Sequence, residues 1–382
     1  MNHSKSEQEK ALETIQSQHL DFIHDVAFDH YGRRIATCSG DRTVKVWDLN
    51  EKGEWTFGPG SDWQAHRGSV TRLSWAHPEF GQLLATCGSD HTCMIWEERD
   101  ASFSFLNMGD MNHNSNNNNN NSNNNNNNNS NNSSANTSGQ DQNSFVSRWV
   151  KKAEFSKAVN CVQFAPRHLG LKLATGGADG VVRIYEAIDV MNLNHWPMNG
   201  SIDFETKSES DLGVTSLSWC GGRFEPPTLV IGGSSSKVSV YSCSNESRQW
   251  HLVAELPGHA KGVYDVSWAP NIGRSYHLIA SAGTDHMLKV HRLKRKINQS
   301  SSDRNKTTAR NGSSLVFEST QVLDTGLDEV WRCSWNVTGT VLASSGDGGI
   351  VQLWKCDFRD NSWKCVSKVQ GGDATTEQAL RM

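Results

Sequence analysis

The sequence contains no long apolar run, and its charges are nearly balanced. No stretch approaches the roughly 18 consecutive apolar residues of a membrane-spanning helix, so we expect no membrane insertion. Its 37 Lys and Arg residues against 41 Asp and Glu residues give a net charge of −4, which favours no direct nucleic-acid binding. The first ten residues, M-N-H-S-K-S-E-Q-E-K, are polar and predict no secretory signal.

Motifs for catalysis and for metal binding are also missing. The sequence has no G-x-S-x-G turn, no Gly-rich phosphate-binding loop and no H-E-x-x-H motif. Its nine cysteines form no C-x-x-C pair and no cluster with histidines, which favours reduced thiols over disulfides or a metal site. We therefore expect a protein that is not an enzyme and that binds no cofactor.

What the sequence does contain is a strand–turn–strand pattern in six copies. In the copy A-T-C-G-S-D-H-T-C-M-I-W, Thr86 stands four residues before Asp90, and Trp96 follows six residues after it. Apolar residues alternate on both sides of a turn rich in Gly, Ser and Asp, which predicts two antiparallel strands. The fourth copy has no turn Asp, and the sixth carries its acid, Asp347, one residue early. The copies span residues 36–47, 85–96, 174–185, 230–241, 280–291 and 343–354.

Each copy is preceded by a strand that ends in an aromatic residue and is followed by a candidate outer strand. Four antiparallel strands per copy predict an all-β fold, a six-bladed β-propeller. The closing positions of the copies lie 49, 89, 56, 50 and 63 residues apart, against a blade unit of roughly 40–45 residues. The aromatic residues are Phe28, Trp75, Phe164, Trp219, Trp268 and Trp335. The outer-strand candidates lie around residues 55–57, 145–155, 202–205, 250–255, 315–323 and 363–367.

This strand count leaves one segment over, residues 11–18 near the N-terminus. Many closed propellers complete their last blade with an N-terminal strand, but here residues 363–367 supply that strand. In one interpretation the spare segment is frayed, is a short helix, or replaces residues 363–367 in a closed ring. In the other, the ring is open between its first and last blades and exposes apolar faces that recruit another chain. We expect the open ring, completed by a partner's blade.

The copies strongly resemble WD repeats. In WD-repeat proteins a His, a Ser or Thr, the turn Asp and a Trp form a buried hydrogen-bonded set, and the second copy offers all four in His66, Thr86, Asp90 and Trp96. We interpret these sets as structural, in preference to a catalytic Asp-His-Ser arrangement, because they satisfy polar groups that are costly to bury. The other sets are His19, Thr37, Asp41 and Trp47; Thr175, Asp179 and Tyr185; His259, Ser281 and Asp285, where His291 replaces the indole; and Ser344 with Trp354.

Two low-complexity insertions interrupt the repeats. Residues 111–143 are rich in Asn and Ser and predict a disordered surface insertion. Residues 294–313 are basic and predict a flexible hairpin tip, with an import signal or a phosphate contact as alternatives. The expected order is an N-terminal tail or spare strand (1–18), blades 1–2 (19–110), the Asn-rich insertion (111–143), the outer strand of blade 2 with blades 3–5 (144–293), the basic loop (294–313), the outer strand of blade 5 with blade 6 (314–369) and a C-terminal tail (370–382).

Several stretches are more specific than the general repeat. They include I-H-D-V-A-F-D (23–29), S-W-A-H-P-E-F-G-Q (74–82) and R-I-Y-E-A-I-D-V-M-N-L-N-H-W (183–196). Together they resemble the Seh-type nucleoporins, a family related to the vesicle-coat protein Sec-thirteen. The Y-E-A and D-V-M-N-L segments favour the nucleoporin over its coat relative.

This resemblance implies a non-catalytic scaffold subunit of the Y-shaped subcomplex of the nuclear pore complex, located at the nuclear envelope. Its open propeller would accept a blade from a helical-solenoid nucleoporin and would associate with other nucleoporins of that subcomplex. The resemblance also implies a second role in a lysosome- or vacuole-associated complex that regulates TOR signalling. The Asn tract and the basic loop depart from the family core and are expected to be peripheral.

For the open ring, we expect the accepting surface to combine the flank of the first blade with the sixth blade. Its residues would be Ile23, Val26, Phe28, Val330, Trp331, Trp335, Val351 and Leu353. Backbone pairing would supply generic affinity, and apolar pockets would select the partner. The alternatives are a closed propeller that binds peptides or serves as a ubiquitin-ligase adaptor, and a vesicle-coat subunit like Sec-thirteen.

Overall fold

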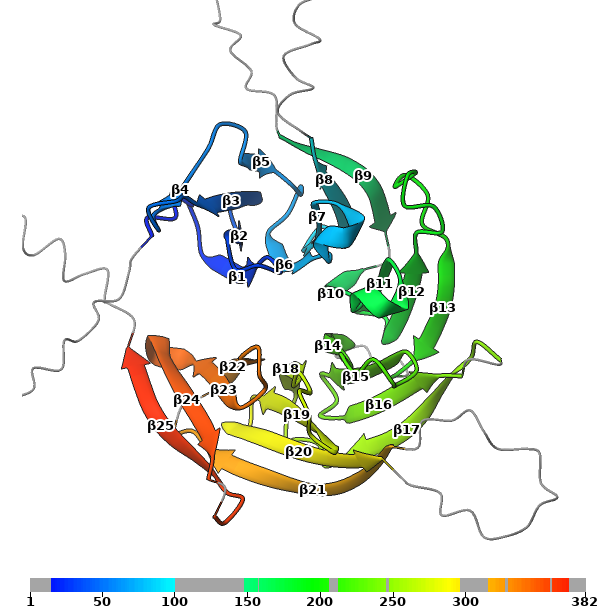
Figure 1. The fold of residues 1–382 in the computed structure, drawn as a ribbon, viewed down its shortest axis with the longest axis vertical. Helices are drawn as coiled ribbons and strands as arrows, with labels where there is room; N and C mark the ends of the chain where they lie inside the picture. The colour runs from blue at the N-terminus through cyan, green and yellow to red at the C-terminus, as the bar shows by residue number, and fades with distance from the viewer. Residues whose placement is uncertain are drawn as a thin grey trace, which may run out of the picture.

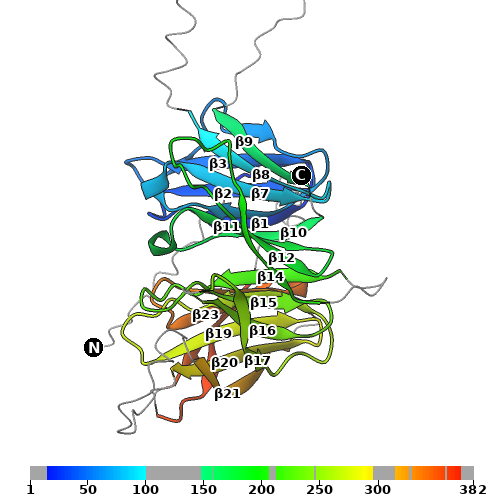
Figure 2. The same ribbon diagram turned by 90° about the vertical axis from the view of Figure 1, so that its right-hand side faces the viewer.

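Six antiparallel sheets surround a central axis in the computed structural model (Figure 1). The structure describes residues 15–99, 148–156, 158–205, 212–244, 247–295, 315–326, 329–357 and 359–370. Regular structure within these residues is almost entirely β-strand, with three short 3₁₀ turns, and Figure 2 shows the ring edge-on. The predicted all-β, six-bladed propeller is confirmed. Among the described residues, no helix has the length and apolar character needed to cross a bilayer.

Strands of the first three blades follow one another from the channel outwards in chain order. Blade 1 contains β1 (Ile23–Phe28), β2 (Arg34–Ser39) and β3 (Thr43–Leu49), with its outer edge divided into β4 (Trp55–Thr56) and β5 (Asp62–Gln64). Blade 2 contains β6 (Val70–Trp75), β7 (Leu83–Gly88), β8 (Thr92–Glu98) and β9 (Trp149–Ser156). Blade 3 contains β10 (Val159–Phe164), β11 (Lys172–Gly177), β12 (Val181–Glu186) and β13 (Met198–Asp203).

The last three blades repeat this order. Blade 4 contains β14 (Val214–Trp219), β15 (Thr228–Gly233), β16 (Val238–Cys243) and β17 (Trp250–Leu256). Blade 5 contains β18 (Val263–Trp268), β19 (Tyr276–Gly283), β20 (Met287–Arg295) and β21 (Leu315–Asp324). Blade 6 contains β22 (Val330–Trp335), β23 (Val341–Gly346), β24 (Ile350–Cys356) and β25 (Trp363–Gln370). All six innermost strands end at the aromatic residue that the sequence predicted.

The last blade takes its outer strand from its own C-terminal segment. β25 pairs with β24, whereas residues 15–18, the described part of the spare segment, form no strand. The carbonyl of Gln18 instead accepts a hydrogen bond of 2.8 Å from Lys45 Nζ. The N-terminal segment therefore does not replace β25. Residues 1–14, 111–143, 296–313 and 371–382 of the predicted tails and insertions lie outside the described residues.

A hydrogen-bonded set joins the strands of blade 2. His66 Nδ1 lies 3.0 Å from Asp90 Oδ1, and its Nε2 lies 2.7 Å from Thr86 Oγ1, which also accepts a bond of 3.0 Å from Trp96 Nε1. Burial lowers the pKa of His66. Partial burial acts to raise the pKa of Asp90, but hydrogen bonds from the backbone of Arg67 and other donors lower it to about 2. The set therefore holds a neutral imidazole and a carboxylate inside the blade.

Blades 1, 5 and 6 use parts of the same arrangement. His19 contacts Asp41 and Thr37, each at 2.9 Å, but the Trp47 ring packs on Phe57 and makes no hydrogen bond with described residues. In blade 5, a second histidine stands in the place of the indole. The contacts there are His259–Asp285 at 2.7 Å, His259–Ser281 at 2.8 Å and Ser281–His291 at 2.9 Å; in blade 6, Trp354 donates to Ser344 at 2.9 Å.

The set expected in blade 3 does not form. Because no histidine precedes β10, Asp179 pairs with Arg183 at 2.5 Å instead. The Thr175 hydroxyl lies 3.5 Å from the carbonyl of Arg183, and the Tyr185 ring stacks on Phe155 with centroids 4.1 Å apart. An ion pair and an aromatic stack take the place of the His–Asp–Thr chain.

His291 makes stability depend on pH. Burial lowers its pKa to about 3, so the folded chain leaves it neutral while the unfolded chain protonates it below pH about 6.5. Stability should therefore fall as the pH decreases from about 6.5 towards 3, with this residue accounting for about 2 kcal/mol of the loss at pH 5. His291→Gln keeps a polar side chain that does not titrate. The free energy of unfolding of this variant, measured in urea, should therefore decrease less between pH 7 and pH 5 than that of the unaltered protein, by that amount. Equal losses in both proteins would contradict this assignment.

Candidate interaction site between the first and last blades

One arrangement joins neighbouring blades. A β-bulge near the start of each innermost strand interrupts the period-two alternation, so that its first, fourth and sixth residues share a face. That face lies against the second and third strands of the preceding blade. In blade 3, for example, Val159, Val162 and Phe164 share one core with Ala85 and Ile95 of blade 2. Five such cores join blades 1 to 6 in series.

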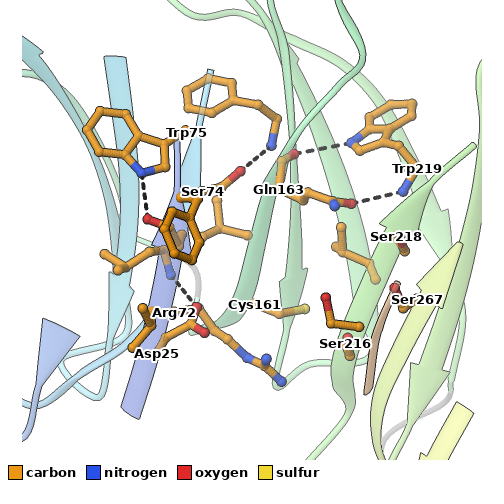
Figure 3. Close-up of a pocket in the computed structure, with 18 of the residues that line it drawn as sticks. Asp25, Arg72, Ser74, Trp75, Cys161, Gln163, Ser216, Ser218, Trp219 and Ser267 are labelled. Atoms are coloured by element: carbon orange, nitrogen blue, oxygen red, sulfur yellow. Dashed lines mark hydrogen bonds between the residues drawn. The ribbon is translucent and has the colours of Figure 1, made fainter. Parts of the chain in front are cut away.

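Hydrogen bonds between innermost strands repeat along with this packing. The indole of Trp75 donates to the carbonyl of Ala27 at 3.0 Å, and that of Trp219 donates to Gln163 at 3.2 Å (Figure 3). Trp335 makes the same contact with Ser267 at 3.1 Å. In blades 2, 4 and 6, the Trp that ends the innermost strand thus anchors its blade to the one before.

Within the part of the chain that the structure describes, no apolar core covers the face of blade 1 that is directed towards blade 6. Ile23, Val26 and Phe28 occupy the first, fourth and sixth positions of β1 and are 42%, 52% and 58% exposed. The residues equivalent to Val26 in the other five blades are 3–7% exposed: Leu73, Val162, Leu217, Val266 and Cys333. The residues at this position are apolar in all six blades. Val26 is therefore exposed because of the place of blade 1 in the ring and not because of its residue type.

The opposite face, on blade 6, is uncovered as well. Val351 is 37% exposed, whereas its equivalents Val44, Cys93, Val182, Val238 and Leu288 are at most 1% exposed. Ala343, Ser345 and Leu353 are only partly buried, although their counterparts in blade 1, Ala36, Cys38 and Val46, are fully buried. We call the two faces together the seam; its residues are Ile23, Val26, Phe28, Ala343, Ser345, Val351 and Leu353.

Contacts across the seam are polar and lie near the channel. Arg332 Nη2 donates to the carbonyl of His24 at 2.8 Å and lies 3.7 Å from Asp25. Within the described residues, none of the five cores combines side chains of blade 6 and blade 1. A cavity of about 960 Å³ fills the channel and reaches both faces of the seam, where Phe28 and Val351 line it. Figure 1 shows the two blades facing each other across this joint.

Charges in the channel connect the blades on both sides of the seam. Arg72 of blade 2 donates to the carbonyl of Tyr264 at 3.3 Å and lies 3.7 Å from Asp265 of blade 5. Asp25 of blade 1 accepts a bond of 2.9 Å from the amide of Leu73 (Figure 3). Burial raises the pKa of Asp25 and of Asp265, and the positive charge of Arg72 opposes that rise. Alternating charges thus connect the inner strands of blades 1, 2 and 5 across the channel, in addition to the apolar cores between neighbouring blades.

Three residues expected on the accepting surface lie elsewhere. Val330 is fully buried in the core shared with blade 5, and the Trp335 indole donates to Ser267 of blade 5. Trp331 stacks on Tyr264 with centroids 4.3 Å apart. The expectation is corrected because an innermost strand packs on the preceding blade, whereas the second and third strands of blade 6 face the seam.

Sequence reasoning also missed Ala343 and Ser345. The signal was present, because these residues align with Ala36 and Cys38 of the first copy. An Ala and a small residue at these positions leave room for the innermost strand of a following blade. Ile23, Val26, Phe28, Val351 and Leu353 do lie on the seam.

The fold and its hydrogen-bonded sets define a WD-repeat propeller. The family model described as "WD domain, G-beta repeat" matches residues 10–48, 58–97, 149–186, 250–292 and 317–355. The unmatched residues 187–249 contain the fourth copy, which has no turn Asp. The copy that the family model leaves unmatched is therefore the one that departs most from the repeat pattern.

Full-length similarity identifies the family within this class. Proteins named Nucleoporin SEH1 from Xenopus tropicalis and Homo sapiens are each 38% identical over 371 residues, covering 94% of this chain and 88% of theirs. The Danio rerio protein of that name is 36% identical over 373 residues, covering 94% and 87%. The chain belongs to the SEH1 nucleoporin family, which confirms the resemblance to Seh-type nucleoporins.

Matched substitutions at equivalent positions test the exposure of the seam. Val26→Asp places a carboxylate on an exposed face and should change the free energy of unfolding by less than about 1 kcal/mol. Val266→Asp makes the same change at the equivalent buried position and should cost at least about 3 kcal/mol. Urea unfolding followed by circular dichroism measures both. Equal destabilisation would show that the face of blade 1 is covered in solution.

Proposed function

We propose that this chain is a non-catalytic scaffold subunit of the Y-shaped subcomplex of the nuclear pore complex, at the nuclear envelope. Its seam accepts a blade from a helical-solenoid nucleoporin, and through that partner the chain joins other nucleoporins of the subcomplex. Membership of the SEH1 nucleoporin family supports the assignment to the pore. The exposed apolar faces of blades 1 and 6 support the assignment of the partner site.

The geometry of the seam favours an inserted blade over a strand added at an edge. Both of its walls are sheet faces, and in the rest of the ring such faces are covered by another blade. A donated blade would present its own second and third strands to Ile23, Val26 and Phe28. Its innermost strand would lie against Ala343 and Val351. Full burial of one aliphatic or aromatic side chain contributes about 1.5–3 kcal/mol, so several half-exposed residues together supply substantial affinity.

We also propose a second assembly for the same seam, in a lysosome- or vacuole-associated complex that regulates TOR signalling. The family resemblance supports this role. One seam accepts one blade, so the two scaffold partners would exclude each other on a single copy of the chain. Purification of either assembly should therefore recover the chain without the other partner.

A peptide-binding role is the second candidate, and one cluster favours it. The stacked rings of Trp331 and Tyr264 carry carboxylates at their polar tips. Trp331 Nε1 donates to Asp347 at 2.7 Å, and the Tyr264 hydroxyl donates to Glu329 at 3.1 Å. Trp331 and Asp347 are exposed and Tyr264 and Glu329 are partly buried. Such a group of aromatic and acidic side chains suits the cationic side chain of a basic peptide.

Affinity purification with quantitative mass spectrometry tests the seam. Val26→Asp and Val351→Asp should each reduce recovery of the solenoid nucleoporin at least tenfold, because each places an unpaired charge in the proposed interface. Val322→Asp is the matched control, since Val322 is exposed on the outer strand of blade 5, which does not border the seam. It should leave recovery unchanged.

Two results would reject the proposal. One is equal recovery of the solenoid nucleoporin by all three variants. The other is recovery of histones or ubiquitin-ligase subunits in place of nucleoporins, which would favour the peptide-binding alternative. Loss of nucleoporins with retention of TOR-regulating subunits would separate the two proposed assemblies.

A further inference from the structure

A second cavity lies at the joint between blades 5 and 6, apart from the seam. Its volume is about 420 Å³, within the range of sites that hold a small ligand or a side chain. The buried side chains of Leu278, Val290 and Trp363 form its apolar part. The ion pair of Arg292 and Glu318 also lines it, and the uncharged polar groups at its margin include Ser319, Gln321, Thr340 and Asn361.

At two other joints, the loop after the innermost strand fills the corresponding region. The 3₁₀ turn Pro78–Phe80 packs Phe80 against the core of blades 2 and 3, and the turn Arg167–Leu169 packs Leu169 against that of blades 3 and 4. In blade 5 the loop is two residues longer, since Ala269 bonds to Leu278 where Ala76 bonds to Leu83. Its apolar residue, Ile272, is largely exposed. The described loop of blade 5 thus inserts no apolar side chain equivalent to Phe80 of blade 2 or Leu169 of blade 3.

The longer loop brings a cation to the cavity instead. Arg274 donates to the carbonyls of Gly339 and Pro270 at 2.6 and 2.5 Å, and its buried Nε has no hydrogen-bond partner among the described residues. Within the same residues it forms no ion pair with a carboxylate. Arg292, which also lies over the Tyr276 ring, is paired with Glu318 at 2.8 Å. Arg274 therefore leaves one uncompensated positive charge beside an apolar cavity.

We propose that this cavity binds a short extended segment of a partner protein, which inserts one Leu or Phe side chain and places an acidic residue against Arg274. The apolar side chain takes the position that Phe80 and Leu169 fill at the other joints. A carboxylate forms the charge-assisted hydrogen bonds that backbone carbonyls do not supply. An apolar anchor in a pocket with a charged pair at its rim is a common mode of peptide recognition. The site is independent of the seam and of the proposed function.

The test uses the full chain and a defined set of labelled peptides. The probes are fluorescein-labelled ten-residue peptides of Gly and Ser that carry one Leu or Phe and one Asp, at each separation from one to four residues. Ser319→Trp places an indole over the cavity from an exposed strand position. Val322→Trp adds the same side chain to the same strand at an exposed position that does not line the cavity.

At least one peptide should bind in fluorescence polarisation, and Ser319→Trp should weaken its binding by at least tenfold while Val322→Trp changes it less than about twofold. Replacing Asp by Asn in the peptide should weaken binding by roughly tenfold, because the charge on Arg274 is then unpaired. Absence of any binding below a Kd of about 1 mM would overturn the proposal. Equal effects of the two Trp variants, or equal binding of the Asn peptide, would overturn it as well.

Discussion

The architecture depends on one packing rule, namely that each blade is buried only by its two neighbours. The bulge in every innermost strand turns its first, fourth and sixth side chains towards the preceding blade. The second and third strands offer small and β-branched residues to the following blade, as Ala85 and Ile95 do. A chain of six complete blades satisfies five joints in this way. Among the described residues, the sixth joint has no shared apolar core, and polar contacts of Arg332 join blade 6 to blade 1 there.

Hydrogen-bonded sets perform a separate task within each blade, and they tolerate substitution because only donor and acceptor positions must be kept. His291 replaces a Trp in blade 5 yet still contacts Ser281, with Thr320 Oγ1 on its other ring nitrogen at 2.8 Å. Asp179 in blade 3 finds a cation in Arg183 when no histidine is present. These hydrogen-bonded residues fix the positions of the strands within a blade, and their side chains lie inside it. The surfaces left for other molecules are the exposed sheet faces at the seam and the joint between blades 5 and 6.

Local chemistry made much of the fold predictable from the sequence. A strand–turn–strand copy marks each blade, with a turn Asp in all copies but the fourth and a closing aromatic residue or histidine. The ends of the innermost strands at Phe28, Trp75 and Trp219 were therefore predicted correctly. The seam was only partly predictable, because the direction in which β22 packs depends on a bulge and on the ring as a whole. Val330 was therefore assigned to the wrong side, and Ala343 was missed. The cavity beside Arg274 depends on the path of one loop, which repeat spacing does not specify.

Blade 6 differs from the others in that both of its faces are incompletely packed. One face forms a wall of the seam through Val351 and Leu353, and the other borders the cavity through Trp363. β24 carries Val351 and Leu353 and pairs with β25, which begins at Trp363, so the two sites share a continuous backbone ladder. A partner that packs on the seam would contact β24, and the backbone ladder joins that strand to β25 and the wall of the cavity. Blade 6 is therefore the element that two partners of this chain would share.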